Sequence, residues 1–571
     1  MKVLVRLTFL VLSVLVYSYQ ATKTGPDWWK SSVIYQIYPR SFKDSDNDGI
    51  GDLQGIISKI DYFVELGVDA IWLSPIYKSP MVDAGYDISD YRSIAPEYGN
   101  LSDFKELLEA AHKNGLKLIL DFVPNHTSNL HEWFNKSVAR EEGYEDYYLW
   151  NDGYVDDDGV RQPPNNWLSL WSFSGWEWNE QRQQYYFHQF SIQQPDLNYR
   201  SEKVRQEMKD ILTYWLDIGV DGFRVDAVPH IYEDELLRDE PIVPDSGVDD
   251  TNWNYLNHIY TKDQPETFEL VYSWRTHLDN YTNTVGGDTR MFMTECSSDM
   301  ENLVKYYGNE NGTVLGAHFT FNFYFLGINE NTTAADLQSD ITVWYQNLPS
   351  IYTFNWLTGN HDNHRVASKV GQSRVDAYNM LISFLDGVTI TYMAEEIGQE
   401  NGEVTCEQGQ DPSAIKNCTT FNETTRDFER TPFQWDNSTN AGFNEGAPTW
   451  LPVSSKYLET NLQEERLASR SHYHVYTDLV QLKASLSAYN SSYIFVNSLL
   501  NNRLLEVQKA LDDPHQSTYR LYFNTGNEAL TVSLDQNYTV VIPSVNLAYT
   551  QGLTDNDLVL NSGDSVIIKV L

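Results

Sequence analysis

Short apolar segments alternate with amphipathic segments along most of the chain before residue 470. Each of these apolar segments has the length and the aromatic or β-branched content of a buried strand. The eight segments are Val33–Tyr38, Ala70–Pro75, Lys117–Pro124, Gly222–Ala227, Met291–Glu295, His318–Phe325, Tyr352–Thr358 and Val388–Met393. Among the amphipathic segments, Leu101–Asn114 has apolar residues at helical spacing and is followed by Gly115, a residue type that commonly ends helices. Eight strands interleaved with helices predict an α/β fold, a closed parallel (β/α)8 TIM barrel.

Two parts of the chain depart from this alternation. The third and fourth predicted strands are separated by a stretch rich in Trp, Tyr, Asn and Asp that is far longer than an ordinary barrel connection. We therefore expect residues 127–198 to form an inserted domain that covers the site. After residue 469, a helical pattern gives way to short alternating segments, which predict a C-terminal antiparallel β domain over residues 469–571. The barrel itself is assigned to residues 19–126 and 199–468.

The amino terminus has the pattern of a secretory signal peptide. Charged residues in Met1–Arg6 precede the apolar run Leu7–Val16, and Ser18 offers a cleavage site, so residues 1–18 are predicted to be removed. The apolar run is short for a membrane span, although an uncleaved anchor is the alternative. The carboxyl end shows no lipid-anchor signal. We expect a secreted, extracellular glycoprotein, because Asn-x-Ser/Thr sequons are frequent. They begin at Asn100, Asn135, Asn280, Asn311, Asn331, Asn422, Asn437, Asn490 and Asn537.

Composition narrows the class of partner. The chain has 80 acidic and 40 basic residues, a formal net charge of -40, which disfavours nucleic acid as a partner. Aromatic residues make up 14% of the sequence, and aromatic rings stack on the apolar faces of sugars, although they also fill cores. The three cysteines fit one disulfide, Cys406 with Cys418 across a polar loop, and a buried thiol at Cys296.

Three acidic residues end predicted strands far apart in the sequence. Asp226 and Glu295 each follow an apolar run directly, and Asp362 comes shortly after the seventh run. The carboxyl ends of parallel barrel strands meet at one mouth, so we expect these acids to lie together. Arg224 and His361, close to two of the acids in sequence, would hold them against desolvation. Hydrolysis of a glycosidic bond needs one carboxylate and one carboxylic acid, which such a group provides.

The motifs around these acids carry a resemblance to a known family. The motifs are Asp121–His126, Gln194–Asn198, Gly222–Asp226, Thr294–Glu295 and Asn360–Asp362. In this order they resemble the sequence regions of the α-amylase family of glycoside hydrolases and cover essentially the whole barrel. Three further segments, Tyr35–Phe42, Asp83–Ser89 and Arg430–Asp436, are similar to those of insect maltases, which are secreted α-glucosidases.

The resemblance implies a role for each acid. Asp226 would be the nucleophile that forms a covalent glucosyl intermediate, Glu295 the general acid and then base, and Asp362 the group that stabilises the charged transition state. Arg224, two residues before Asp226, would face the same side of the barrel and keep the nucleophile ionised. The remaining sugar contacts implied are Asp87, Tyr86, His126, His361 and Arg426.

Part of the substrate preference can be predicted from the sequence. Ala227 follows the nucleophile, where members of the family that act on α-1,6 bonds commonly carry Val. Asp87 and Arg426 would close the pocket around the terminal sugar. We therefore expect a retaining, exo-acting α-glucosidase, a maltase, that releases terminal glucose from maltose and small α-1,4-linked malto-oligosaccharides, with sucrose as a further candidate. No organic cofactor is implied.

A structural calcium ion is also expected. The loop after the first predicted strand offers Asp44, Asp46, Asp48 and Asp52, with the carbonyl of Ile50, as hard oxygen ligands. It lacks the glutamate that closes an EF-hand loop, but similar loops in the family bind calcium. A simple acidic turn is the alternative interpretation.

A second calcium site is implied only by the resemblance. Asn125 and Asp196 would bind that ion between the inserted domain and the barrel.

Other functions fit the same barrel. One is a non-catalytic protein, such as an amino-acid-transporter heavy chain or a receptor. The others are an endo-acting amylase and a glucosyl transferase or isomerase. The three acids argue against a non-catalytic protein. Whether the protein is an endo-acting amylase, a transferase or an isomerase depends on the geometry around the leaving sugar.

Overall fold

The computed structural model describes residues 23–414, 417–534, 536–547, 552–554 and 557–571. Eight parallel strands form a nearly closed barrel in the order β13-β12-β11-β5-β2-β1-β15-β14. The strands are β1 (Val33–Ile37), β2 (Ala70–Leu73), β5 (Lys117–Phe122), β11 (Gly222–Val225), β12 (Met291–Thr294), β13 (Phe319–Thr320), β14 (Asn355–Trp356) and β15 (Val388–Tyr392). The predicted TIM barrel is confirmed.

The sixth and seventh strands are shorter than predicted. Each contains only two residues, and the apolar run after β13 continues as a short 3-10 helix at Tyr324–Gly327. The side chain of Asn355 joins these two edges of the barrel: its Oδ1 accepts from the backbone nitrogen of Asn322 at 2.9 Å, and its Nδ2 donates to the carbonyl of Thr320 at 2.6 Å. A buried amide thus supplies the polar contacts that a longer strand pair would make.

Helices surround the barrel. They are α1 (Leu53–Ile57), α2 (Ile60–Leu66), α3 (Leu101–Lys113), α5 (Glu202–Ile218), α6 (Pro265–Val285), α7 (Met300–Lys305), α8 (Ala334–Asn347), α9 (Val366–Val370), α10 (Val375–Phe384), α12 (Leu462–Leu467) and α13 (His472–Leu486). The sequence signals explain the ends of α3: Asn100 and Asp103 form a capping box at its start, and Asn114 caps its other end. No helix among the described residues is long and apolar enough to cross a membrane. The predicted signal peptide lies outside these residues.

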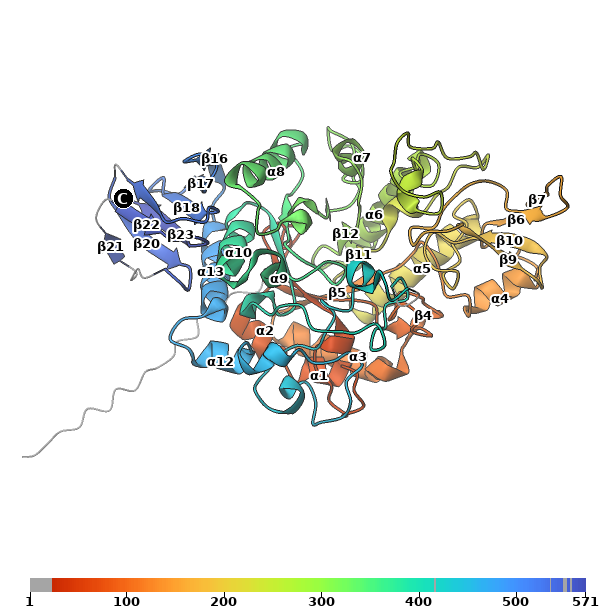
Figure 1. Ribbon diagram of the computed structural model, residues 1–571, viewed down its shortest axis with the longest axis horizontal. Helices are drawn as coiled ribbons and strands as arrows, with labels where there is room; N and C mark the ends of the chain where they lie inside the picture. The colour runs from red at the N-terminus through yellow and green to blue at the C-terminus, as the bar shows by residue number, and fades with distance from the viewer. Residues whose placement is uncertain (1–22, 415–416, 535, 548–551, 555–556) are drawn as a thin grey trace, which may run out of the picture.

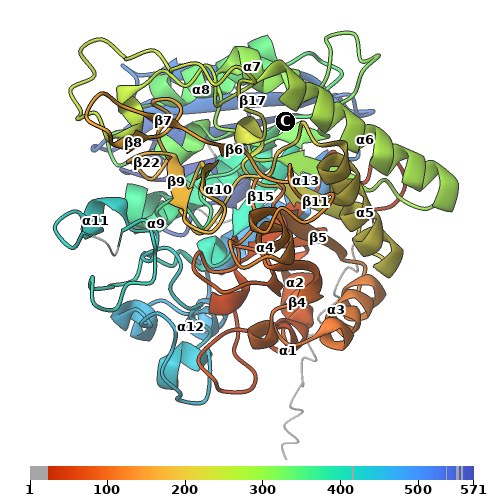
Figure 2. The same ribbon diagram turned by 90° about the vertical axis from the view of Figure 1, so that its right-hand side faces the viewer.

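Residues 127–198 leave the barrel after β5 as one aromatic-rich segment. It contains α4 (Glu132–Val138), a sheet of β6 (Trp150–Asn151), β10 (Gln184–Phe187) and β9 (Trp176–Asn179), and the pair β7 (Tyr154–Val155) and β8 (Arg161–Gln162). A small core of Trp167, Trp176, Tyr185 and Phe187 holds it together. In Figure 1 its strands lie at the right of the molecule, and Figure 2 views the molecule from that side.

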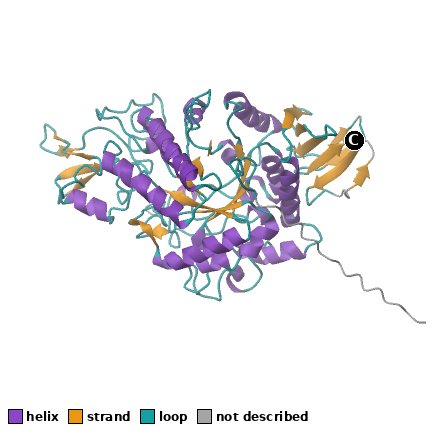
Figure 3. Ribbon diagram, turned by 180° about the vertical axis from the view of Figure 1, so that it is seen from behind, coloured by secondary structure: helices purple, strands orange, loops and turns teal. Residues whose placement is uncertain are grey.

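The C-terminal strands lie at the opposite end of the molecule in Figure 1 and form the antiparallel orange sheet of Figure 3. The six-stranded sheet has the order β16 (Ser491–Leu499), β17 (Leu504–Leu511), β18 (Thr518–Asn524), β23 (Ser565–Val570), β20 (Tyr538–Pro543) and β21 (Gly552–Thr554). A second sheet pairs β19 (Leu530–Ser533) with β22 (Asp557–Leu560). Between barrel and sheet lies α13, whose Val475, Leu479 and Leu486 share a core with barrel strands.

Candidate active site

The three strand-end acids meet at the mouth of the barrel. Asp226 follows β11, Glu295 follows β12, and Asp362 lies in the loop after β14. All three line one cavity of about 1080 Å³ that is walled on another side by aromatic residues of the inserted segment, among them Trp171 and Phe190. The parallel strands therefore bring together acids that are far apart in the sequence, as predicted.

One guanidinium contacts three carboxyl groups beneath the cavity. Arg224 Nη1 donates to Asp226 Oδ1 at 2.6 Å and to Asp121 Oδ1 at 2.8 Å, and Nη2 lies 2.7 Å from Glu295 Oε2. Arg224 and Asp121 are almost completely buried. The charge of Arg224 is thus divided among three acids from three adjacent strands.

This division changes the expectation for the nucleophile. Burial raises the pKa of Asp226 well above its ordinary value, because Arg224 only partly opposes the desolvation while Glu295 and Asp121 add negative charge. Burial likewise raises the pKa of Asp121 to about 6 against the lowering effect of Arg224. The single positive charge of Arg224 therefore only partly offsets the burial of these acids. A pair of carboxyl groups with one proton is the state that glycosidic bond cleavage requires.

The surroundings of Asp362 lower its pKa, whereas those of Asp226 raise the pKa of that acid. Burial would raise its pKa, but contacts with His361 and the charges of Arg430, Arg426 and Arg224 together place it well below the ordinary value. Arg430 Nη2 lies 2.6 Å and Arg426 Nη1 3.2 Å from Asp362 Oδ1. This acid therefore stays a carboxylate, which suits a residue that stabilises positive charge on a sugar.

Tyr86 and His361 lie side by side at the floor of the cavity, with nearly parallel rings that are hydrogen-bonded edge to edge. Their ring planes differ by 3° and their centroids are 5.3 Å apart. Gln36 Nε2 lies 2.9 Å from His361 Nδ1, the Tyr86 hydroxyl 2.7 Å from His361 Nε2, and the same hydroxyl donates to Asp121 Oδ2 at 3.1 Å. Burial lowers the pKa of His361 to about 3 despite the charge of Asp362. His361 is therefore a neutral hydrogen-bonding group, and the arginines supply the positive charge around Asp362.

His126 also lines the cavity as a neutral group. Burial lowers its pKa to about 4, and its Nε2 lies 3.2 Å from the Tyr86 carbonyl oxygen. Tyr86, His126 and His361 are thus brought to one pocket, as predicted, and all three present hydrogen-bonding atoms in a desolvated site.

The structure does not bring Asp87 to Arg426. The fully buried side chain of Asp87 accepts from Ser79 Oγ at 2.9 Å and from the backbone nitrogens of Val82 and Asp83 at 3.0 and 2.9 Å. Asp83 takes the predicted place: its Oδ1 accepts from Arg426 Nη2 at 2.9 Å, and it lines the cavity. The expectation that Asp87 closes the pocket is corrected accordingly, because Asp87 instead folds the turn that presents Asp83.

Several site residues escaped the sequence analysis. They are Asp83, Asp121, Asp411 and Arg430. Asp121, Arg430 and Asp83 each begin a motif that carried the family resemblance, so a signal was present. Asp411 lies in a polar loop without any motif, and only its two hydrogen bonds with the guanidinium of Arg426, at 2.8 and 3.0 Å, identify it.

The first predicted cation site has a partly suitable geometry. Asp44, Asp46 and Asp48 each place a carboxylate oxygen within 4.8 Å of the others. Burial and the neighbouring acids raise the pKa of Asp48, so a cation there would relieve repulsion. Asp52 is oriented differently: its carboxylate accepts from Ser45 and from Gly55 at the start of α1. The three clustered acids fit a hard divalent cation, with Asp52 bracing the loop.

The second predicted cation site contains two facing side chains. Asn125 Nδ2 donates to Asp196 Oδ2 at 3.1 Å, and the buried Oδ1 of Asn125 has no partner. Burial raises the pKa of Asp196 well above its ordinary value. The second site therefore offers fewer carboxylates than the first, and it stays a prediction.

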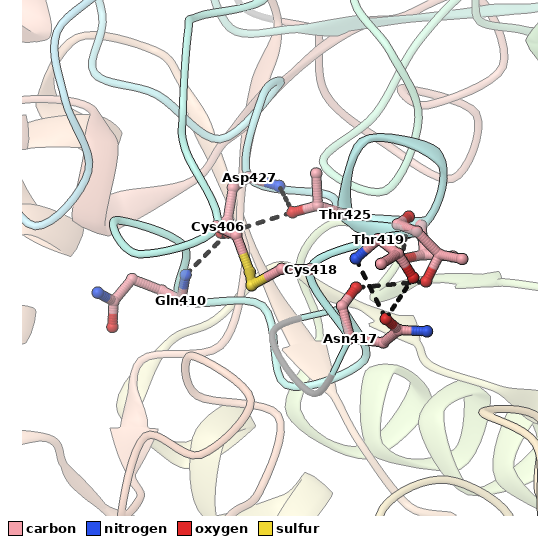
Figure 4. Close-up of a disulfide and its surroundings, with 9 residues drawn as sticks. Cys406, Gln410, Asn417, Cys418, Thr419, Thr425 and Asp427 are labelled. Carbon is pink, nitrogen blue, oxygen red and sulfur yellow. Dashed lines mark hydrogen bonds between the residues drawn. A yellow bond between two sulfur atoms is a disulfide. The ribbon is translucent and has the colours of Figure 1, made fainter.

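The predicted disulfide is confirmed. Cys406 and Cys418 are bonded, with Cα atoms 5.6 Å apart, and Figure 4 shows the pair beside Asp427. Cys296 is a buried free thiol, as expected.

The chain is similar to a known family and to several known proteins. Residues 36–490 match the family described as alpha amylase, catalytic domain. Maltase 1 of Drosophila virilis is 50% identical over 511 residues, which cover 89% of this chain and 80% of that protein. The salivary alpha-glucosidase of Aedes aegypti is 40% identical over 558 residues, 95% of each chain. The crystal structure of an alpha-glucosyl transfer enzyme, XgtA, superposes with a TM-score of 0.84 at 33% identity and covers 95% of this chain and 99% of its own.

Proposed function

This chain belongs to the α-amylase family of glycoside hydrolases and is an α-glucosidase, and from that premise we propose how its residues divide the reaction. The observation that carries the proposal is the contact of one guanidinium, Arg224, with both Asp226 and Glu295 at the floor of the cavity. A shared cation beneath two carboxyl groups keeps them close and holds one of them as an anion.

The reaction has two steps that use the pair in turn. In the first, a carboxylate oxygen of Asp226 forms a bond to C1 of the terminal glucose. The bond from C1 to the glycosidic oxygen breaks at the same time, and Glu295 gives its proton to that oxygen. In the second, Glu295 takes a proton from water, the water oxygen bonds to C1, and the bond to Asp226 breaks. Two inversions leave the product in the α configuration.

The other cavity residues support the charged sugar. Asp362 is an anion whose field favours positive charge on the ring during both steps, and it is held by Arg430 and Arg426. Tyr86 and His361 provide a flat, neutral surface against which a sugar ring packs.

The Arg426–Asp83 ion pair supports exo action. It spans the cavity wall beside Asp362 and is largely shielded from solvent, with side-chain exposures of 19% and 6%. An oligosaccharide that continued past the terminal glucose on this side would have to break that ion pair. The pocket therefore accepts a chain end, and Ala227 at the lining favours α-1,4-linked glucose such as that of maltose.

Glucosyl transfer is the second candidate activity. It is favoured by the similarity to the transfer enzyme XgtA and by the size of the cavity, about 1080 Å³, which exceeds the need of one sugar. In transfer, a sugar hydroxyl replaces water in the second step.

Product analysis tests both activities. Purified protein is incubated separately with maltose, sucrose, isomaltose and soluble starch, and the first products are followed by NMR. We expect α-glucose from maltose, slower release from isomaltose and little shortening of starch from within the chain. Initial β-glucose would overturn the retaining mechanism, and oligosaccharides longer than the substrate would show transfer.

We also propose a bound cation and an extracellular location. The carboxylates of Asp44, Asp46 and Asp48 would hold calcium, with the carbonyl of Ile50 as a further ligand, and the ion would stabilise the loop after β1. Secretion is supported by the signal-peptide pattern and the sequons.

A further inference from the structure

Arg426 has three carboxylate partners, and one of them determines its orientation. Asp411 accepts from Arg426 Nε at 3.0 Å and from Nη2 at 2.8 Å, and it also accepts from the Arg426 backbone nitrogen at 2.7 Å. The same guanidinium reaches Asp83 at 2.9 Å and Asp362 at 3.2 Å. Two parallel hydrogen bonds hold a guanidinium plane more firmly than single ones. Because Asp411 binds Nε and Nη2, it sets the direction of Nη1, which is the nitrogen that contacts Asp362.

Asp411 itself lies behind the cavity wall. Its side chain has no exposed surface, and it is absent from the lining, whereas Arg426 and Ser413 of the same region belong to it. Burial would raise the pKa of Asp411, but the charges of Arg426 and Arg430 place it far below its ordinary value. Asp411 is therefore a permanent anion that touches the sugar-binding arginine and not the sugar.

The backbone around Asp411 is held by a second carboxylate and by the disulfide. Asp427 Oδ2 accepts from the backbone nitrogens of Gln410 and Asp411 at 2.8 and 3.1 Å. Figure 4 shows Asp427 and Gln410 in the surroundings of the bond between Cys406 and Cys418. Asp411 lies between these two cysteines in sequence, so the covalent bond closes the loop that carries it. Closing a loop of this size removes alternative conformations.

We propose that Asp411 is a positioning residue for Arg426, and that the disulfide between Cys406 and Cys418 maintains the orientation of the sugar-binding arginine through Asp411. This inference rests on the proposed role of Arg426 in binding terminal glucose. Without Asp411, Nε loses its acceptor and Nη2 keeps only the single hydrogen bond to Asp83, so the guanidinium is free to turn about that bond and move Nη1 away from Asp362. The disulfide then contributes to substrate affinity and not only to stability.

A double-mutant cycle tests the proposal. Asp411→Asn keeps the size of the side chain but removes its charge, and we expect kcat/KM for maltose to fall about 100-fold, chiefly through a higher KM, because a misplaced binding group costs that much. In an Arg426→Ala background the same substitution should change kcat/KM less than about twofold, since residues that act only through each other are not additive. Glu407→Gln, an exposed acid in the same loop, is the matched control and should leave both constants unchanged.

An equal loss in both backgrounds would overturn the proposal, because it would show a general structural role. So would an unchanged KM in a folded Asp411→Asn protein. Folding of each variant is checked by circular dichroism. The paired Cys406→Ser and Cys418→Ser variant should show the same dependence on Arg426, with a smaller loss.

Glucose binding separates this proposal from the proposed function. Calorimetric titration of glucose measures the Kd of each variant without turnover, and Asp411→Asn should weaken it. If the wild-type protein binds glucose but cleaves no α-glucoside, the proposed reaction fails while the positioning role is still tested. If the wild-type protein cleaves maltose and Asp411→Asn binds glucose normally, the positioning role fails alone.

Discussion

Arg224 Nη1 lies 2.6 Å from Asp226 Oδ1, but its charge is shared with two further acids. The nucleophile is consequently held at a cost in stability, because two buried carboxyl groups, Asp121 and Asp226, and the half-buried Glu295 surround one guanidinium. Active sites commonly sacrifice stability in this way.

Asp226→Asn should abolish turnover without unfolding the protein. We expect kcat on maltose to fall by at least about 10⁴-fold, as for other lost nucleophiles. The free energy of unfolding should stay equal or rise, because one buried acid is removed from the group around Arg224. Steady-state kinetics and thermal unfolding measure both effects. Substantial maltase activity in this variant would refute the assignment of Asp226.

Glu295→Gln should distinguish the role of the proton donor from the role of the nucleophile. With maltose, loss of the acid should lower kcat about 10²- to 10⁴-fold. With 4-nitrophenyl α-glucoside the phenolate leaves without a proton, so the first bond cleavage should be much less affected. Burst kinetics with the two substrates make the comparison. Equal losses with both would contradict the general-acid role.

Asp83→Asn and Asp87→Asn form a matched pair. Asp83 faces Arg426 in the cavity wall, so its amide should raise KM for maltose while Tm changes little. Asp87 accepts hydrogen bonds only behind the wall, and in either orientation its amide would turn a donor toward one of the backbone nitrogens, that of Val82 or that of Asp83. That mismatch should destabilise the fold by about 1–3 kcal/mol. If Asp87→Asn alone raised KM, the corrected placement would be wrong.

His472 should make stability depend on pH. Burial lowers its pKa, but the charge of Asp376, 2.7 Å from Nδ1, outweighs burial and raises the pKa above the ordinary value. A raised folded-state pKa means that the stabilisation is complete below about pH 6.5, the unfolded value, and is lost as pH rises through the folded value.

Asp376 also accepts from the backbone nitrogen of Val545, so this pair joins α10 and α13 to the C-terminal domain. The Tm of His472→Gln should therefore fall less than that of wild type between neutral and alkaline pH. His515→Gln, in an exposed loop, serves as the control. Parallel curves for wild type and His472→Gln would show that another group is responsible.

Removal of calcium should destabilise the protein if the acidic loop binds it. Adding calcium at 100 times its Kd to chelator-treated protein should stabilise it by about 2.7 kcal/mol, and Asp46→Asn should abolish this response. Asp61→Asn, an exposed acid on α2, should retain it. Calorimetry with magnesium in place of calcium tests selectivity. An equal response in Asp46→Asn would exclude this loop as the binding site.

Sequence periodicity was sufficient for the barrel but not for every element. Runs such as Val388–Met393 are buried on all sides and therefore continuously apolar, so they identify strands directly. The run from His318 is also apolar, yet only Phe319 and Thr320 pair as a strand, since β13 has a paired neighbour on one side only. Helix α13 likewise follows the predicted domain boundary but packs against both the barrel strands and the C-terminal sheet, which local pattern does not reveal.

The sequence by itself determined the three acids at strand ends, because parallel strands of one barrel place their carboxyl ends at one mouth. It also determined the cysteine pair. Only the tertiary structure decided that Asp83 and not Asp87 faces Arg426, although both lie in the same turn, because the backbone of that turn points one carboxylate inward. The tertiary structure alone also decided that Arg224 contacts three acids and that Asp411 orients Arg426. Those relationships depend on distances between residues far apart in the chain, which no local pattern encodes.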